Sequence, residues 1–134
     1  MAIKPDYHEA CYLRGNALLD LNRYKEAIAS YEKAIAFKPD LHQAWGNRGT
    51  ALTALGRYEE AFVSYNRVLE IKPDDKYAIY KKAACYTLQG DIRKAIETLQ
   101  HAITLNLECR EWAKTDADFD RIRDDERFQA VVGE

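Results

Sequence analysis

The sequence predicts an all-α fold built from stacked pairs of helices, and three repeated features support this prediction. Three stretches of the chain align at a step of 34 residues, and one shared position holds Gly15, Gly49 and Ala83. A second shared position holds Ala27, Ala61 and Ala95. Lys38-Pro39-Asp40 also recurs one step later as Lys72-Pro73-Asp74. A period of this length is typical of stacked helical repeats rather than of a globule closed around a catalytic pocket.

Each period contains two amphipathic runs, which we expect to form two helices. In the second period, apolar residues recur at helical spacing in residues 44–55 and again in residues 61–69. Gly56 stands between the runs, where a left-handed residue ends a helix, and Pro73 stops the second run. Asn22 and Gly90 occupy the Gly56 position in the other periods. The pattern predicts helices over residues 8–21, 24–37, 42–55, 58–71, 76–89 and 92–105.

The small residues at shared positions predict where the helices of one repeat cross. A side chain larger than alanine at these positions would push the two backbones apart. We therefore expect close crossings at the positions of Gly49 and Ala61 and at their equivalents in the other two repeats.

The 34-residue pattern resembles the tetratricopeptide repeat, whose consensus reads W-x2-L-G-x2-Y, then A-x3-F, then P. The second period matches it at Trp45, Gly49, Leu52, Ala61, Tyr65 and Pro73. The departures at the consensus leucine are Arg14, Arg48 and Lys82. The resemblance covers residues 1 to about 108 and implies a right-handed superhelical solenoid of three repeats. It divides the chain into the tail of a preceding repeat (1–7), repeats over 8–41, 42–75 and 76–109, and C-terminal capping helices (110–134).

The C-terminal segment is similar to the tail that closes many bacterial tetratricopeptide arrays. The similarity runs from Ala113 through Phe128. We expect Trp112 to pack on the last repeat, and we expect the apolar side chains of Phe119, Ile122 and Phe128 to cover its open end.

The N-terminal segment suggests that the chain is an excised piece of a longer array. Residues 2–6 match residues 36–40 and 70–74, which end one repeat and begin the next. The alternative is a natural start that reuses a helix-entry sequence. An excised end would leave Cys11 and neighbouring apolar positions uncovered, so we expect weak end-to-end self-association through residues 2–19.

Composition argues against several classes of function. The net charge of −2 offers no general attraction to nucleic acid or membrane, and no apolar run approaches transmembrane length. The three cysteines form no CxxC pair, which favours a reducing, cytoplasmic setting.

No catalytic motif is visible in the sequence. Asp116, Asp118 and Asp120 could begin a calcium loop, but Arg121 and Arg127 stand where such a loop needs glycine and glutamate. Helix capping explains these acids better. We therefore expect a protein that is not an enzyme and that holds no metal or cofactor.

The remaining positions of the first helix of each repeat predict a binding surface on the inner wall of the solenoid. Tyrosine offers contact area at low entropic cost, and asparagine can pair with a peptide backbone. We expect a scaffold that binds a protein or peptide segment there. The alternatives are a solvated wall without a partner, a structural spacer or self-association module of a longer protein, and the sensor arm of a multidomain enzyme. The candidate residues are Tyr12, Asn16, Asn47, Thr50, Tyr77, Tyr80 and Lys81.

The resemblance also permits a comparison with family members that clamp the acidic C-termini of heat-shock chaperones. Their five clamp positions fall on Tyr12, Asn16, Asn47, Tyr77 and Lys81. The two asparagines match and Lys81 matches in charge, but the tyrosines replace two cations. A clamp without these cations would hold a carboxylate poorly, so we expect a peptide partner other than such a tail.

Overall fold

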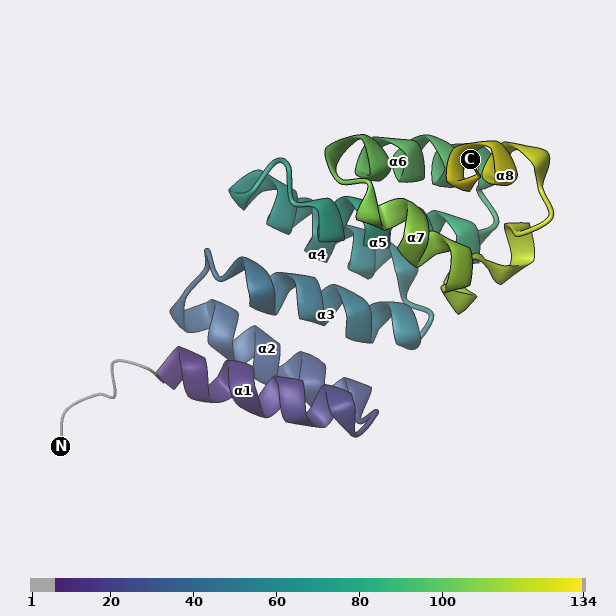
Figure 1. Ribbon diagram of the computed structural model, residues 1–134. Coiled ribbons are helices and arrows are strands. Elements are labelled where there is room, and N and C mark those ends of the chain that lie inside the picture. The colour runs from purple at the N-terminus through teal and green to yellow at the C-terminus, as the bar shows by residue number, and fades with distance from the viewer. Residues whose placement is uncertain (1–6, 134) are drawn as a thin grey trace, which may run out of the picture. The chain divides into compact units, whose positions relative to one another are not determined.

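The computed structural model describes residues 7–133, and helices are the only regular secondary structure in that range (Figure 1). The chain divides into two compact units, Met1–Lys72 and Pro73–Glu134. The first unit contains α1 (Tyr7–Asp20), α2 (Tyr24–Phe37), α3 (His42–Ala54) and α4 (Tyr58–Ile71). The second contains α5 (Lys76–Gln89), α6 (Ile92–Leu105), α7 (Glu108–Thr115), the 3₁₀ helix η1 (Ala117–Ile122) and α8 (Glu126–Val132).

The first six helices begin and end within one residue of the predicted bounds. The predicted left-handed turns are present as well, with φ of 61° at Asn22, 76° at Gly56 and 91° at Gly90. Asp75 caps α5 through a hydrogen bond that the Ala78 backbone N–H donates over 3.0 Å. None of the helices within residues 7–133 has the length and apolar character that a membrane crossing requires.

The helices of one repeat cross at the small residues, as predicted. A Cβ atom added to Gly15 would lie 2.6 Å from the ring of Tyr31, and one added to Gly49 would lie 2.7 Å from the ring of Tyr65. The absent side chain therefore makes room for the tyrosine of the second helix. The third repeat uses a different pair at these positions, Ala83 with Leu99, and both are fully buried.

Gly49→Ala is expected to lower the free energy of unfolding by about 1–2 kcal/mol, because overpacking against the buried Tyr65 ring outweighs the gain in helix propensity. Gly46→Ala is the matched control in the same helix. A Cβ at Gly46 would meet only a methyl group of Val68 at 3.8 Å, so this variant should be more stable than the parent by up to about 1 kcal/mol. Urea unfolding of both variants measures the difference. Equal stabilities would refute the close crossing.

The arginines at the consensus leucine position link the two helices of their repeats. The Arg48 guanidinium donates to the hydroxyl of Ser64 over 2.6 Å, and Arg14 donates to Ser30 in the same way. Both serine side chains are buried, so the bonds satisfy polar groups inside the repeat. In the third repeat this position holds Lys82, and burial lowers the pKa of its ammonium group.

The core of the first unit corrects one expectation about the N-terminal end. Cys11 and Leu18 are each only 7% exposed and belong to the buried cluster formed with α2 and Ala44 of α3. Cys11 was expected to be uncovered, but it lies on the side of α1 that packs against α2. The predicted tail in residues 1–7 and the predicted contact through residues 2–19 fall partly on residues 1–6, which lie outside the described residues.

The C-terminal segment of the second unit packs through the predicted apolar side chains. Phe119 is fully buried, and Phe128 and Ile122 are 1% and 3% exposed. The rings of Phe119 and Phe128 stack with their centroids 5.7 Å apart. Within this unit, α7 and α8 contact α6, and η1 contacts α5. The segment is therefore an integral part of the second unit's core.

Candidate functional site

The first unit brings four of the candidate residues together on two helices that lie side by side. Tyr12 and Asn16 are four residues apart on α1, and Asn47 and Thr50 are three apart on α3, so each pair shares one helix face. The helices α1 and α3 contact each other. All four side chains are partly exposed. We call these four residues the amide surface.

A hydrogen-bond network orients the two asparagines. The hydroxyl of Tyr31 donates to Asn16 Oδ1 over 2.6 Å, and Asn47 Nδ2 donates to the same oxygen over 2.9 Å. Burial raises the pKa of Tyr31, so its hydroxyl remains a donor at neutral pH. Within residues 7–133, this arrangement leaves the Asn16 amide hydrogens and Asn47 Oδ1 without a protein partner. One donor and one acceptor therefore lie next to each other on a partly exposed surface.

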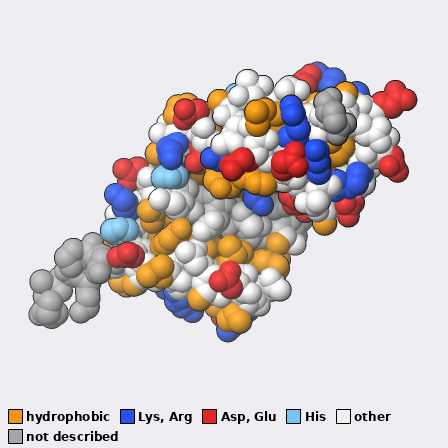
Figure 2. All heavy atoms as spheres, in the orientation of Figure 1, with side chains coloured by type: hydrophobic (Ala, Val, Ile, Leu, Met, Phe, Trp, Pro, Cys, Tyr) orange, Lys and Arg blue, Asp and Glu red, His pale blue; other side chains and the backbone are white. Residues whose placement is uncertain are grey.

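The other two residues of the amide surface have more limited roles. The Thr50 hydroxyl donates to the Gly46 carbonyl over 3.3 Å and lies 3.4 Å from the hydroxyl of Tyr65. The Tyr12 ring lies 6.1 Å from that of Tyr31 and packs on the core of the first unit. In the face drawn in Figure 2, hydrophobic side chains lie over α1. The asparagine network thus has an apolar border on α1.

The second unit carries the other three candidate residues on α5. Tyr77 is 57% exposed and stacks on Trp112 of α7 with ring centroids 5.0 Å apart. Lys81 is partly exposed. Burial and the charge of Asp116 raise the pKa of Asp118, and the positive charge of Lys81 acts against this rise. Tyr77 is therefore an accessible aromatic surface, and the charge of Lys81 acts on Asp118.

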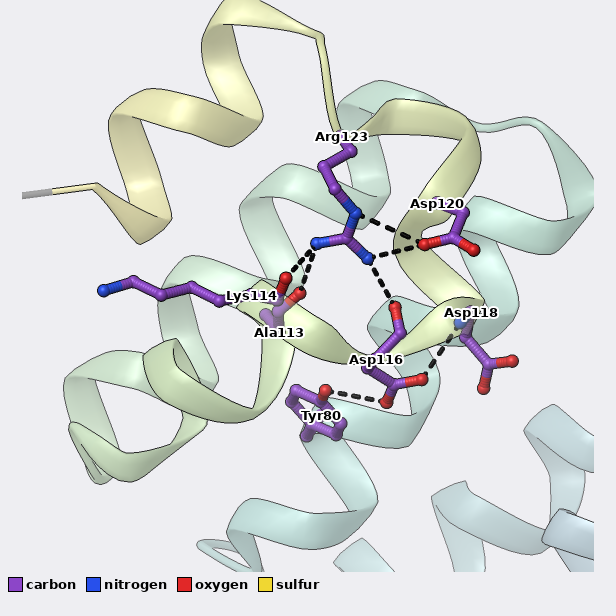
Figure 3. Close-up of polar contacts among 7 residues, drawn as sticks. All are labelled: Tyr80, Ala113, Lys114, Asp116, Asp118, Asp120 and Arg123. Atoms are coloured by element: carbon purple, nitrogen blue, oxygen red, sulfur yellow. Dashed lines mark hydrogen bonds and ion pairs between the residues drawn. The ribbon is translucent and has the colours of Figure 1, made fainter.

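Tyr80 does not lie on an open wall, which corrects the expected exposure of this candidate residue. It is 3% exposed, and its ring meets those of Trp112 and Phe119 edge-on, with centroids 5.4 and 5.5 Å away. Its hydroxyl donates to Asp116 Oδ2 over 2.8 Å (Figure 3). Burial and this hydrogen bond raise the pKa of Tyr80. The periodicity could not reveal this position, because α7 and η1 cover α5 outside the repeat pattern.

Arg123 is a structural residue to which the sequence analysis assigned no role. Its guanidinium donates to the carbonyl oxygens of Ala113, Lys114 and Asp116, and it pairs with Asp120 over 2.8 Å (Figure 3). It therefore ties the end of α7 to η1. Arg123 lies within the segment that is similar to the closing tail of tetratricopeptide arrays, and this similarity could have marked it as a structural residue. The similarity alone does not reveal which carbonyl groups Arg123 binds.

The arrangement offers polar recognition rather than reactive groups. Within the described part of the chain, no three His, Cys, Asp or Glu side chains are grouped to hold a metal ion. The groups of the amide surface are amides and hydroxyls, which act as hydrogen-bond donors and acceptors.

Two tetratricopeptide repeat family models match the chain, one over residues 12–76 and the other over residues 52–117. Together they span residues 12–117. No curated protein matches the sequence.

Solved structures of similar fold include three protein-binding domains. The first tetratricopeptide domain of Spaghetti, bound to an HSP90 peptide, is 16% identical, with 98% of each chain covered and a TM-score of 0.75. The TPR2B domain of yeast Sti1, in complex with pHsp70, is 24% identical, with 87% of this chain and 93% of that chain covered and a TM-score of 0.73. The Yersinia enterocolitica secretion chaperone SycD, with a peptide of the translocator YopD, is 17% identical, with 98% and 96% covered and a TM-score of 0.75. These likenesses show the fold, and with the family models they lead to one conclusion: the chain belongs to the tetratricopeptide repeat family.

Proposed function

We propose that this protein is a non-catalytic interaction scaffold that binds an extended peptide segment on the amide surface. The observation that carries the proposal is the pair of oriented amides. Asn16 offers N–H donors and Asn47 offers a carbonyl acceptor, held next to each other by the hydrogen bonds to Asn16 Oδ1. A peptide backbone presents the complementary pair, one carbonyl and one N–H per residue.

An extended segment suits this surface better than a helix. A helix uses most of its backbone groups internally, whereas an extended segment leaves them available to a partner. The hydrogen bond from the Tyr31 hydroxyl already fixes the orientation of the Asn16 side chain. Asn16 therefore loses little conformational freedom when a peptide binds.

The candidate residues, taken unit by unit, favour an apolar or uncharged segment over an acidic tail. Tyr12 supplies aromatic area at one border, and Tyr77 supplies it on the second unit. Lys81 is the one cation among the candidate residues, and it lies in the field of Asp118. A carboxylate held by a single lysine gains little, whereas tyrosines bind apolar groups well.

The structural relatives support a peptide-binding role at the level of the fold. Spaghetti and SycD, described above, were each solved with a peptide. We extend this role to the present chain because its own side chains supply the oriented amides.

Asn47→Ala tests the proposal, using peptides selected from a random display library against the unmodified chain. We expect about tenfold weaker peptide binding, a loss of about 1–2 kcal/mol. The fold should be unaffected, since Asn47 is partly exposed and the bond between Tyr31 and Asn16 remains. Asn66→Ala on the exposed side of α4 is the matched control and should bind like the parent. Peptides that bind Asn47→Ala and the parent equally would contradict the proposal.

A further inference from the structure

An exposed carboxylate, that of Asp20, lies beside the amide surface. Asp20 is the last residue of α1 and stands four residues after Asn16. The two side chains therefore share one face of the helix and are about 6 Å apart along its axis. Burial raises the pKa of Tyr31, and the negative charge of Asp20 raises it further. Because the Tyr31 hydroxyl donates to Asn16 Oδ1, the Asp20 carboxylate acts on the same hydrogen bonds that orient the amides.

The repeat fold does not require a carboxylate at this position. The equivalent residues of the other two repeats are Ala54 and Leu88. A negative charge at the C-terminal end of a helix opposes the helix dipole, and α1 has no basic residue in its last turn to offset this charge. Asp20 is therefore expected to lower the stability of the first unit slightly. A residue that breaks a local rule in this way is a candidate for a role in binding.

The arginines that precede and follow Asp20 in the chain are bound to other groups. The Arg23 guanidinium pairs with Glu26 through two hydrogen bonds of 2.6 and 2.8 Å. Arg14 donates to the buried hydroxyl of Ser30. Within residues 7–133, no ion pair involves Asp20. Its carboxylate is therefore available to a cation that a partner supplies.

We propose that Asp20 makes the amide surface select a basic peptide, in which a lysine or arginine pairs with the Asp20 carboxylate while the backbone binds Asn16 and Asn47. This inference rests on the proposed function and adds the charge of the partner to it. The segment is apolar or uncharged where it meets the amides and carries the cation one or two residues away. The long, flexible side chain of lysine or arginine can reach across the distance between Asn16 and Asp20.

The test uses a peptide selected from a random display library against the unmodified chain. We expect the selected peptides to share a lysine or arginine at one position. Asp20→Asn should bind such a peptide about three- to fivefold more weakly at low ionic strength, because an exposed ion pair is lost. The same variant should bind a copy of the peptide with glutamine at the basic position as well as the parent does. Asp40→Asn, at an exposed carboxylate that pairs with Lys38, is the matched control and should bind the basic peptide like the parent.

Charge reversal and thermal unfolding separate a role in binding from a role in folding. Asp20→Lys should reject the basic peptide and should bind a copy with glutamate at the basic position better than the parent does. Asp20→Asn should melt at or slightly above the temperature of the parent, because it removes a charge that opposes the helix dipole. Weaker binding by a variant of undiminished stability assigns the effect to the partner's charge.

Two results would overturn the inference and leave the proposed function in place, provided that Asn47→Ala still weakens binding. One is a set of selected peptides without a shared basic residue. The other is equal affinity of the parent and Asp20→Asn for the basic peptide. Equal binding of the peptide by Asn47→Ala and the parent would overturn both the proposed function and this inference.

Discussion

Phe119→Ala is expected to lower the free energy of unfolding by about 3–5 kcal/mol, the range for removing a fully buried phenylalanine ring. Phe119 has no exposed surface and contacts the rings of Tyr80 and Phe128. Its loss leaves a cavity between η1, α5 and α8, which the surrounding side chains fill only in part. Guanidinium unfolding followed by circular dichroism measures the change.

Phe37→Ala is the matched control for this prediction. Phe37 is 60% exposed at the end of α2. Phe37→Ala should therefore lower the free energy of unfolding by much less than Phe119→Ala does. Deleting the chain from Asp116 onward should have a larger effect and cause aggregation, because it removes Phe119, Ile122 and Phe128 together. A Phe119→Ala variant as stable as Phe37→Ala would mean that the C-terminal segment contributes little to the second unit.

Arg123→Ala is expected to lower the free energy of unfolding by about 2–3 kcal/mol, because three backbone carbonyls lose a charged hydrogen-bond donor at once. The carbonyls belong to Ala113, Lys114 and Asp116, where the chain turns from α7 into η1. Arg123→Lys should restore little of this loss, since a single ammonium group cannot reproduce the planar fork of the guanidinium. Thermal and denaturant unfolding of the two variants give the comparison.

Arg93→Ala provides the baseline for losing a surface arginine. Arg93 pairs with Glu97, and both side chains are largely exposed, so Arg93→Ala should lower the free energy of unfolding by about 0–1 kcal/mol. If Arg123→Ala and Arg93→Ala were equally stable, the hydrogen bonds of Arg123 would be incidental to the fold.

The repeat architecture was predictable because its signals are local and recur. Asn22, Gly56 and Gly90 each adopt the left-handed turn that their position demands. Gly49 makes room for a ring that lies 16 residues later in the chain, and the pattern repeats this pairing at Gly15. Turn chemistry and helical periodicity are properties of neighbouring residues, so they can be read without a structure.

The candidate site was predictable only as a set of residues, and its internal organisation was not. The repeat pattern placed Asn16 and Asn47 on equivalent helices, but their hydrogen bond to each other depends on how α1 and α3 pack. The Tyr31 ring packs against Gly15 at the crossing of α1 and α2, and its hydroxyl also reaches Asn16. Tyr80 shows the opposite case, because a segment outside the repeats buries it. Long-range packing decided each of these outcomes.

The most direct test of the peptide-binding account is an NMR titration that follows the side-chain amide signals of the asparagines. A library-selected peptide should shift the Asn16 and Asn47 side-chain signals together, because the carbonyl and the N–H of one peptide residue are expected to bind the free Asn16 hydrogens and Asn47 Oδ1. The Asn66 signal on the exposed side of α4 should remain unchanged. A peptide that binds while the Asn16 and Asn47 signals stay in place would contradict the account.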